Sequence, residues 1–298
     1  MIVAGGIDLG GTKIEVQKFD ADWEVTDKRR IETPSTYSEL VAAVTDQVCW
    51  LRKYHSHLPV GIAAAGLKNP SSGTWISANL SANGMPFAQD IAKATGGQQT
   101  WLNDCRAFTQ AEVIFGAGQS KGTVVGLVLG TGIAGGISID GALINNGDGQ
   151  SGEFGHMPIP GTIIAAHNLP ILKCGCGRFG CYETYGSGPG LERLAKHLLG
   201  CDLTSQEIIS DRTHQEISRI WEIWCDINAA LILTIVTTLD PRTIVLGGGM
   251  SKISGLIEEL ESALMRVAWK ELPLPSIRLG SRGETAAALG AAYAAYHV

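Results

Sequence analysis

The chain has 298 residues, of which 45% are hydrophobic and 17% charged, and its formal net charge is −6. This apolar content argues against a disordered chain, and the length fits one large or two medium α/β domains. The charge is mildly negative and forms no basic stripe, so nucleic acid is not an expected partner.

Cysteine usage and hydropathy predict a cytoplasmic location. The seven cysteines are an odd number, and three of them are clustered in a pattern typical of a metal site. With no signal peptide at the start, this pattern indicates a reducing compartment. The longest apolar run, Ala229–Leu239, is too short to span a bilayer and contains three threonines, so it predicts a buried helix and no membrane partner.

Residues 4–17 predict a strand, a tight turn and a returning strand. The turn consists of Gly10, Gly11, Thr12 and Lys13. Its glycines allow backbone N–H groups to approach an anion, its polar side chains can donate to phosphate, and Asp8 can hold magnesium through water. An ordinary Gly-Gly hairpin explains the same residues equally well.

The next elements alternate helix and strand. They are a helix over Ser38–Arg52, a strand over Val60–Ala65 that ends at Gly66, a polar loop containing Asn79, and a helix over Phe87–Thr95.

A strand over Trp101–Asp104 then leads into a helix over Cys105–Phe115. Asn103 and Asp104 are ordinary helix N-cap residues. A carboxylate at a strand end that faces a cleft is also well placed to act as a general base. The sequence alone leaves both interpretations open.

The strand-turn-strand pattern occurs again in Val124–Ile139, with a turn that contains Thr131 and Gly132. A variant of it in Thr243–Ser251 runs into Gly247, Gly248 and Gly249. Similar units more than a hundred residues apart suggest duplicated halves. We therefore expect two phosphate-binding turns on opposite walls of a cleft between domains, holding a triphosphate.

Residues 150–188 contain the densest group of chemically active side chains. Cys174, Cys176 and Cys181 are too closely spaced to pair neatly as disulfides, and His156 is the nearest credible fourth ligand. Three thiolates and one imidazole form a usual tetrahedral zinc shell, which would be structural because no coordination position is left open. The alternative is a surface loop with reduced cysteines.

Two carboxylates flank this cluster, Glu153 before His156 and Glu183 after Cys181. A bound zinc would fix both of them against a common cavity. Paired carboxylates and an imidazole suit a polyhydroxylated ligand, because carboxylate oxygens accept hydrogen bonds from hydroxyls. Two solvated loop residues remain the alternative.

The rest of the chain is mainly helical. Helices are predicted over Gly188–Leu199, Thr204–Ser210, Gln215–Leu239, Ile253–Ala268 and Glu284–Tyr296.

Taken together, six motifs resemble those of the ROK (repressor, open reading frame, kinase) family of sugar kinases. They are IDLGGTK, LND, LGTGIAGG, GEFGH, CGCGRFGCYET and LDPRTIVLGGGMS. The resemblance extends over nearly the whole chain and is closest to bacterial N-acetylglucosamine kinases and related fructo(manno)kinases. It implies an actin-like, ribonuclease-H-like α/β fold. Its two domains, 1–118 plus 282–298 and 119–281, are expected to lie around a cleft and to close over ATP and sugar.

The resemblance also implies roles for individual residues. Asp104 matches the general base. The sugar-binding positions are Gly66, Asn79, Asn103, Asp104, Glu153, His156 and Glu183. The positions for ATP and Mg²⁺ are Asp8, Gly10, Gly11, Thr12, Lys13, Thr131, Gly132, Gly247, Gly248 and Gly249. The zinc ligands are His156, Cys174, Cys176 and Cys181, and a homodimer is expected.

The activity that this resemblance implies is phosphoryl transfer from Mg-ATP to N-acetylglucosamine O6. Fructokinase, mannokinase and glucokinase activities are the alternatives. One departure is that many relatives have a proline before the glycine where this chain has Ala64-Ala65-Gly66. A sugar-responsive regulator is disfavoured, because the first phosphate strand leaves no room for a DNA-binding segment. An actin-like scaffold ATPase would not need the cysteine cluster.

Overall fold

The computed structural model describes residues 1–147 and 149–298. It divides into two compact units. Unit 1 comprises Met1–Gln119, Gly136–Ser151 and Ser281–Val298, and unit 2 comprises Ser120–Gly135 and Gly152–Gly280.

Unit 1 is built on a five-stranded sheet with the order β3-β2-β1-β4-β7. Its strands are β1 (Ile2–Leu9), β2 (Lys13–Asp20), β3 (Val25–Glu32), β4 (Val60–Ala64) and β7 (Thr100–Asn103). The first three strands are antiparallel, whereas β4 and β7 continue the sheet in parallel from β1. The short strands β5 (Leu67–Lys68) and β6 (Trp75–Ile76) form a separate hairpin. The carboxyl ends of β1, β4 and β7 therefore lie at one edge of the sheet, next to the predicted site residues.

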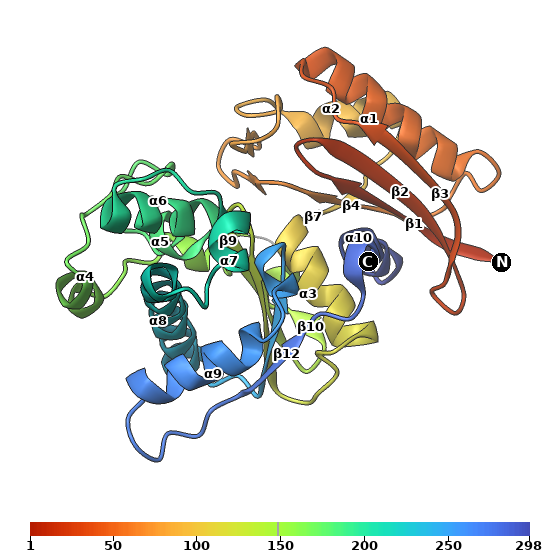
Figure 1. The fold of residues 1–298 in the computed structure, drawn as a ribbon. Helices are drawn as coiled ribbons and strands as arrows, with labels where there is room; N and C mark the ends of the chain where they lie inside the picture. Colours follow the sequence, from red (N-terminus) through yellow and green to blue (C-terminus); the bar gives the residue numbers. More distant parts are fainter. Residues whose placement is uncertain (148) are drawn as a thin grey trace. The chain divides into compact units, whose positions relative to one another are not determined.

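Helices cover both faces of this sheet (Figure 1). On one face, α1 (Tyr37–Arg52) and α2 (Phe87–Thr95) bury an apolar core that includes Ile7 and Leu9. On the other face lie α3 (Asp104–Phe115), the 3-10 turn η4 (Gly283–Thr285) and α10 (Ala286–Tyr296). A Cβ atom on Gly6 would lie 2.0 Å from the carbonyl oxygen of Ala288, so glycine permits this close approach of helix to sheet.

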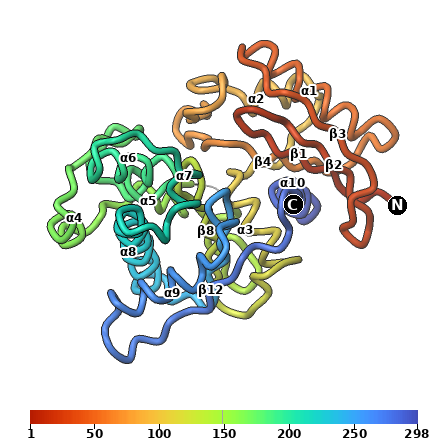
Figure 2. The backbone as a smooth tube through the Cα atoms, in the orientation of Figure 1, coloured from red at the N-terminus to blue at the C-terminus, as the bar shows by residue number. Residues whose placement is uncertain are grey.

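The C-terminal segment packs against the N-terminal strands, as the blue and red ends of the tube in Figure 2 show. Residues 136–151 also belong to unit 1, whereas the sequence suggested that they belong with 119–281. This segment contains β10 (Ala142–Leu143) and η1 (Ile144–Gly147). Leu143 joins the apolar cluster of Leu102 and Ala107, and Gln110 Nε2 donates to Gly141 O over 3.1 Å. These contacts hold the segment against α3.

The second sheet has the order β10-β9-β8-β11-β12. Its further strands are β8 (Thr123–Leu129), β9 (Ile133–Ile139), β11 (Thr243–Gly247) and β12 (Ser276–Leu279). The strands β8, β11 and β12 are parallel, and the boundary between the compact units falls within β9. Both sheets thus contain a hairpin that begins with a buried strand, as the duplicated sequence pattern predicts.

Unit 2 is mainly helical outside its strands. Its helices are α4 (Gly161–His167), α5 (Glu183–Gly186), α6 (Gly188–Leu199), α7 (Ser205–Ser210), α8 (Gln215–Leu239) and α9 (Leu256–Val267), with 3-10 turns η2 (Phe154–His156) and η3 (Met250–Lys252). By length and composition α8 could cross a membrane, but 72% of its most apolar stretch is buried within the protein. It is the central core helix of this unit, packed against α9.

The predicted helices are confirmed, but several elements were not predicted. They include β3, α4 and β12 and the short elements β5, β6, β10 and α5. The strand β3 has the sequence VTDKRRIE and is almost entirely exposed, so it lacks the apolar alternation by which a strand is recognised.

Candidate functional site

The first predicted phosphate turn is a closed backbone turn at the end of β1. Gly10 N donates to Lys13 O over 3.0 Å, and Thr33 Oγ1 donates to Gly10 O over 2.7 Å. A Cβ atom on Gly11 would lie 3.1 Å from Asn79 O, so the predicted polar loop lies directly against this turn. The turn is exposed at Gly11, where a ligand can reach its backbone.

Two acidic side chains come close together beside this turn. Burial, and then the charge of Asp104, raise the pKa of Asp8 to about 7. Glu15 and Glu284 raise that pKa further, while Lys13 lowers it. The structure therefore places Asp8 at the carboxyl end of β1 within electrostatic reach of Asp104 at the start of α3. Such a pair favours a bound cation or a shared proton.

Asn103 is the N-cap of α3, as one of the two interpretations of the sequence predicts. Its Oδ1 accepts from Cys105 N over 3.0 Å, and its Nδ2 donates to Gly66 O over 3.2 Å. Asp104 Oδ1 also accepts from Cys105 N, over 2.9 Å. The cap therefore fixes the carboxylate of Asp104 and ties the end of β7 to the end of β4.

The segment Ala64-Ala65-Gly66 is held from several directions. Ala65 N donates to Leu9 O over 3.2 Å, and Trp75 Nε1 donates to Ala65 O over 3.0 Å. Gly66 has a φ of +104°, and a Cβ atom there would lie 2.2 Å from Ile76 O. The alanine before Gly66 uses its N–H in this network, and a proline in its place would have no N–H to donate.

The second predicted phosphate turn lies in unit 2, beside the glycines that follow β11. Gly130 N donates to Gly132 O over 3.0 Å, and Gly188 N donates to Gly130 O over 2.9 Å. A Cβ atom on Gly248 would lie 2.3 Å from Leu129 O. The turn after β8, the glycines after β11 and the start of α6 are therefore packed backbone against backbone.

Glu183 supports this second turn. Its Oε2 accepts from Ile133 N over 3.0 Å, and a Cβ atom on Gly132 would lie 2.7 Å from the same oxygen. The sequence indicated only a sugar-binding role for Glu183. The local sequence pattern gives no indication of its contact with Ile133, because the two residues are fifty positions apart.

The cysteine cluster forms as predicted. The ligand atoms of His156, Cys174, Cys176 and Cys181 all lie within 4.8 Å of one another. His156 Nδ1 is 3.6 Å from Cys174 Sγ, and the Sγ atoms of Cys176 and Cys181 are 3.7 Å apart. One imidazole and three thiols at these separations match the donor set of a tetrahedral zinc site.

The three thiols have different environments. Burial raises the pKa of Cys174 and raises that of Cys181 to about 12, while a hydrogen bond from the backbone at Arg178 lowers the pKa of Cys176.

Glu153 precedes the single turn of η2, and its carbonyl oxygen accepts from His156 N over 3.0 Å. Binding of a metal at His156 would therefore restrain the backbone of Glu153.

Comparison with known proteins identifies the class. A family model described as the ROK family matches residues 4–297, and the chain belongs to this family. It is 35% identical to the N-acetylgalactosamine kinase AgaK of Shewanella sp. strain ANA-3, over 96% of this chain and 94% of that protein. It is 34% identical to the N-acetyl-D-glucosamine kinase of Pectobacterium atrosepticum, over 96% of this chain and 97% of that protein.

Solved structures agree with the family assignment. The ROK hexokinase of Thermus thermophilus superposes with a TM-score of 0.84 at 27% identity, covering 99% of this chain and 98% of that one. The ROK glucokinase of Streptomyces griseus, in complex with glucose and AMPPNP, gives 0.79 at 27% identity, covering 99% and 100%. The predicted actin-like α/β fold is thus confirmed.

Proposed function

We propose that this protein is a sugar kinase that transfers a phosphoryl group from ATP to a hexose hydroxyl. The observation that carries the proposal is the pair Asp8 and Asp104 beside the turn at Gly10–Lys13. Phosphoryl transfer requires a base near the acceptor hydroxyl and a bound cation near the phosphates. Family membership and the named relatives support the same activity.

In this mechanism Asp104 accepts the proton of the sugar hydroxyl. Asn103 caps α3 and, with Cys105 N, fixes the position of that carboxylate. Asp8 would help to hold Mg²⁺, which when bound would supply positive charge to neutralise the phosphoryl oxygens. Lys13 and the N–H groups of the first turn position the phosphates, so that catalysis comes mainly from orientation and electrostatics.

In unit 2, the second turn and the glycines after β11 are proposed to bind the nucleotide. These residues are Thr131, Gly132, Gly247, Gly248 and Gly249. The sugar-binding roles of Gly66, Asn79, Asn103, Glu153, His156 and Glu183 remain predictions that rest on the family resemblance. The hydrogen bond from Ile133 N to Glu183 supports a stable second turn.

N-acetylglucosamine, phosphorylated at O6, is the substrate that we propose first. N-acetylgalactosamine is the second candidate, because a relative of that name is 35% identical. The two sugars differ only in the configuration of one hydroxyl, so the side chains that contact this hydroxyl decide between them. Fructose, mannose and glucose remain the wider alternatives.

The cluster of His156, Cys174, Cys176 and Cys181 is proposed to hold a structural zinc. Its donor set supports this assignment, since thiolate and imidazole ligands favour zinc and leave no position for substrate. A cytoplasmic location and a homodimer remain expectations.

The test of the proposal is sugar-dependent release of ADP. Purified protein with Mg-ATP would be assayed against N-acetylglucosamine, N-acetylgalactosamine, N-acetylmannosamine, glucose, mannose and fructose. We expect the highest kcat/KM with an N-acetylated sugar. Turnover with only fructose or mannose would keep the mechanism and change the substrate, whereas ADP release independent of sugar would contradict the kinase assignment.

A further inference from the structure

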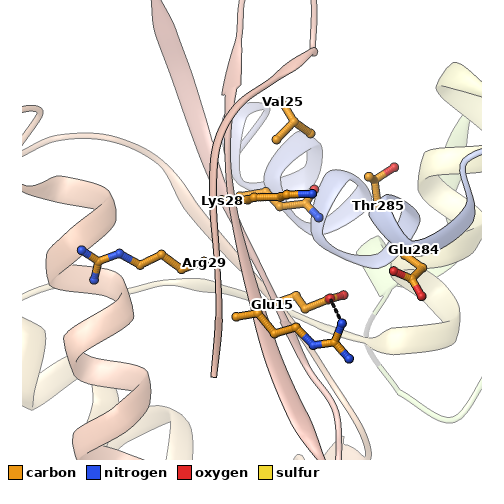
Figure 3. Close-up of a pocket in the computed structure, with 8 residues that line it drawn as sticks. Glu15, Val25, Lys28, Arg29, Glu284 and Thr285 are labelled. Atoms are coloured by element: carbon orange, nitrogen blue, oxygen red, sulfur yellow. Dashed lines mark ion pairs between the residues drawn. The ribbon is translucent and has the colours of Figure 1, made fainter. Parts of the chain in front are cut away.

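A pocket of about 390 Å³ lies in unit 1, on the outer part of the sheet and beside the start of α10 (Figure 3). It is formed by β2, β3 and η4, and none of its residues belongs to the predicted catalytic or binding set. Its volume is in the range of small-molecule sites, roughly 300–1,000 Å³. The lining residues are Glu15, Gln17, Val25, Lys28, Arg29, Arg30, Glu284 and Thr285.

Gln17 provides a buried polar group without a partner. Its side chain is only 5% exposed, and its Oε1 has no hydrogen-bond partner among the described residues. An unpaired buried acceptor is costly, so such atoms in folded proteins are generally satisfied by a bound ligand or water. Because Gln17 lines the pocket, a donor group that enters the pocket would satisfy it.

Only some of the charged side chains that line the pocket form ion pairs within the protein. Arg30 Nη1 is 3.5 Å from Glu15 Oε1, and Glu15 also pairs with Lys13 over 3.2 Å. Within residues 1–147 and 149–298, the side chains of Lys28 and Glu284 make no ion pair or hydrogen bond. The register explains the grouping, because Gln17 lies opposite Lys28, and Glu15 lies opposite Arg30. A ligand would therefore meet the unpaired ammonium group of Lys28 and the exposed guanidinium group of Arg30 on the same face of the sheet.

We propose that this pocket binds a phosphorylated sugar as a second ligand, separate from catalysis. Lys28 and Arg30 would bind the phosphate, as cationic donors commonly do. Gln17 Oε1 and the Glu284 carboxylate would accept hydrogen bonds from the sugar hydroxyls. The pocket lacks an aromatic wall, which disfavours a nucleotide base.

The test measures binding by isothermal titration calorimetry, without ATP, using N-acetylglucosamine 6-phosphate and inorganic phosphate as probes. Lys28→Ala should weaken binding of the sugar phosphate at this site on the order of tenfold, because a charge-assisted contact is lost. Gln17→Leu should weaken the sugar phosphate but leave inorganic phosphate unchanged. Circular dichroism would confirm that each variant is folded.

Arg29→Ala is the matched control. Arg29 is on the same strand and is one of the lining residues, but its side chain points to the opposite side of the sheet from the other labelled side chains (Figure 3). There its guanidinium lies over the ring of Trp50, 4.5 Å from the centroid. Removing it changes the net charge as Lys28→Ala does, yet binding should be retained.

Three outcomes would overturn the proposal. They are no binding of the sugar phosphate at millimolar concentration, equal affinity for inorganic phosphate and the sugar phosphate, and equal loss in Arg29→Ala and Lys28→Ala. Binding that is lost in Asp104→Asn but unaffected by Lys28→Ala would place the probe at the proposed catalytic residues instead. Because the readout is binding, the result does not depend on whether the protein proves to be a kinase.

Discussion

At the scale of single residues, Asp104 is central to the proposed chemistry. Asp104→Asn keeps the shape of the side chain and removes its ability to accept the proton. We expect kcat to fall by roughly 10²–10⁴-fold with little change in the KM for sugar. Initial-rate kinetics would measure both constants, with the exposed Asp22→Asn as a control that keeps full activity. Near-normal turnover of Asp104→Asn would remove this residue from the mechanism.

The raised pKa of Asp8 predicts a pH dependence of stability. Its pKa in the folded protein is about 7, above the ordinary value of 3.8, because of burial and the neighbouring Asp104. The folded state therefore holds the proton more tightly than the unfolded state. The resulting stabilisation is complete below the unfolded pKa and is lost as pH rises through 7.

Between pH 6 and pH 8 this effect should lower the free energy of unfolding on the order of 1 kcal/mol. Urea unfolding in the absence of Mg²⁺, compared with Asp8→Asn at each pH, isolates the contribution, since the other titrating groups are common to both proteins. An identical pH slope in the variant would show that Asp8 titrates normally.

At the scale of elements, the contact of Glu183 with the second turn makes a distinct prediction. Glu183→Ala removes the acceptor for Ile133 N, so the turn should loosen and a non-hydrolysable ATP analogue should bind several-fold more weakly even without sugar. Glu183→Gln keeps an acceptor oxygen and should retain most of the affinity. Equal nucleotide affinity in the two variants would show that the hydrogen bond from Ile133 N to Glu183 does not support nucleotide binding.

The packing of α10 on the first sheet depends on Gly6. In Gly6→Ala the new Cβ would lie 2.0 Å from the backbone oxygen of Ala288, and a backbone atom cannot move aside alone. We expect a loss of about 1–3 kcal/mol or more in the free energy of unfolding, measured by denaturant titration. Gly97→Ala is the control, because its Cβ would make only an ordinary contact at 3.6 Å. Equal stability of the two variants would contradict the close approach.

Periodic elements and contiguous motifs could be predicted from the sequence. The helices α2, α6 and α8 begin and end where the apolar pattern predicts, and the cysteine cluster forms from residues close in sequence. Contacts between distant segments could not be predicted. The bond of Glu183 to Ile133 and the packing of residues 136–151 against α3 depend on the tertiary fold, and the exposed strand β3 has no apolar pattern.

At the scale of the whole molecule, the proposed zinc should contribute to the stability of the fold. Protein purified without added metal should contain one zinc ion per chain. Removing the zinc with a chelator should lower Tm by roughly 5 °C or more. Cys176→Ser should mimic this loss, whereas Cys49→Ser, at another exposed cysteine, should not. Zinc-free protein with an unchanged Tm would contradict the structural role.

The most direct test of the central claim is to identify the product formed from Mg-ATP and N-acetylglucosamine. Phosphorus NMR and mass spectrometry of the reaction mixture should show one sugar monophosphate esterified at O6, formed in step with ADP, and almost none with Asp104→Asn. ADP accompanied by free phosphate and unmodified sugar, across the whole sugar panel, would contradict the account.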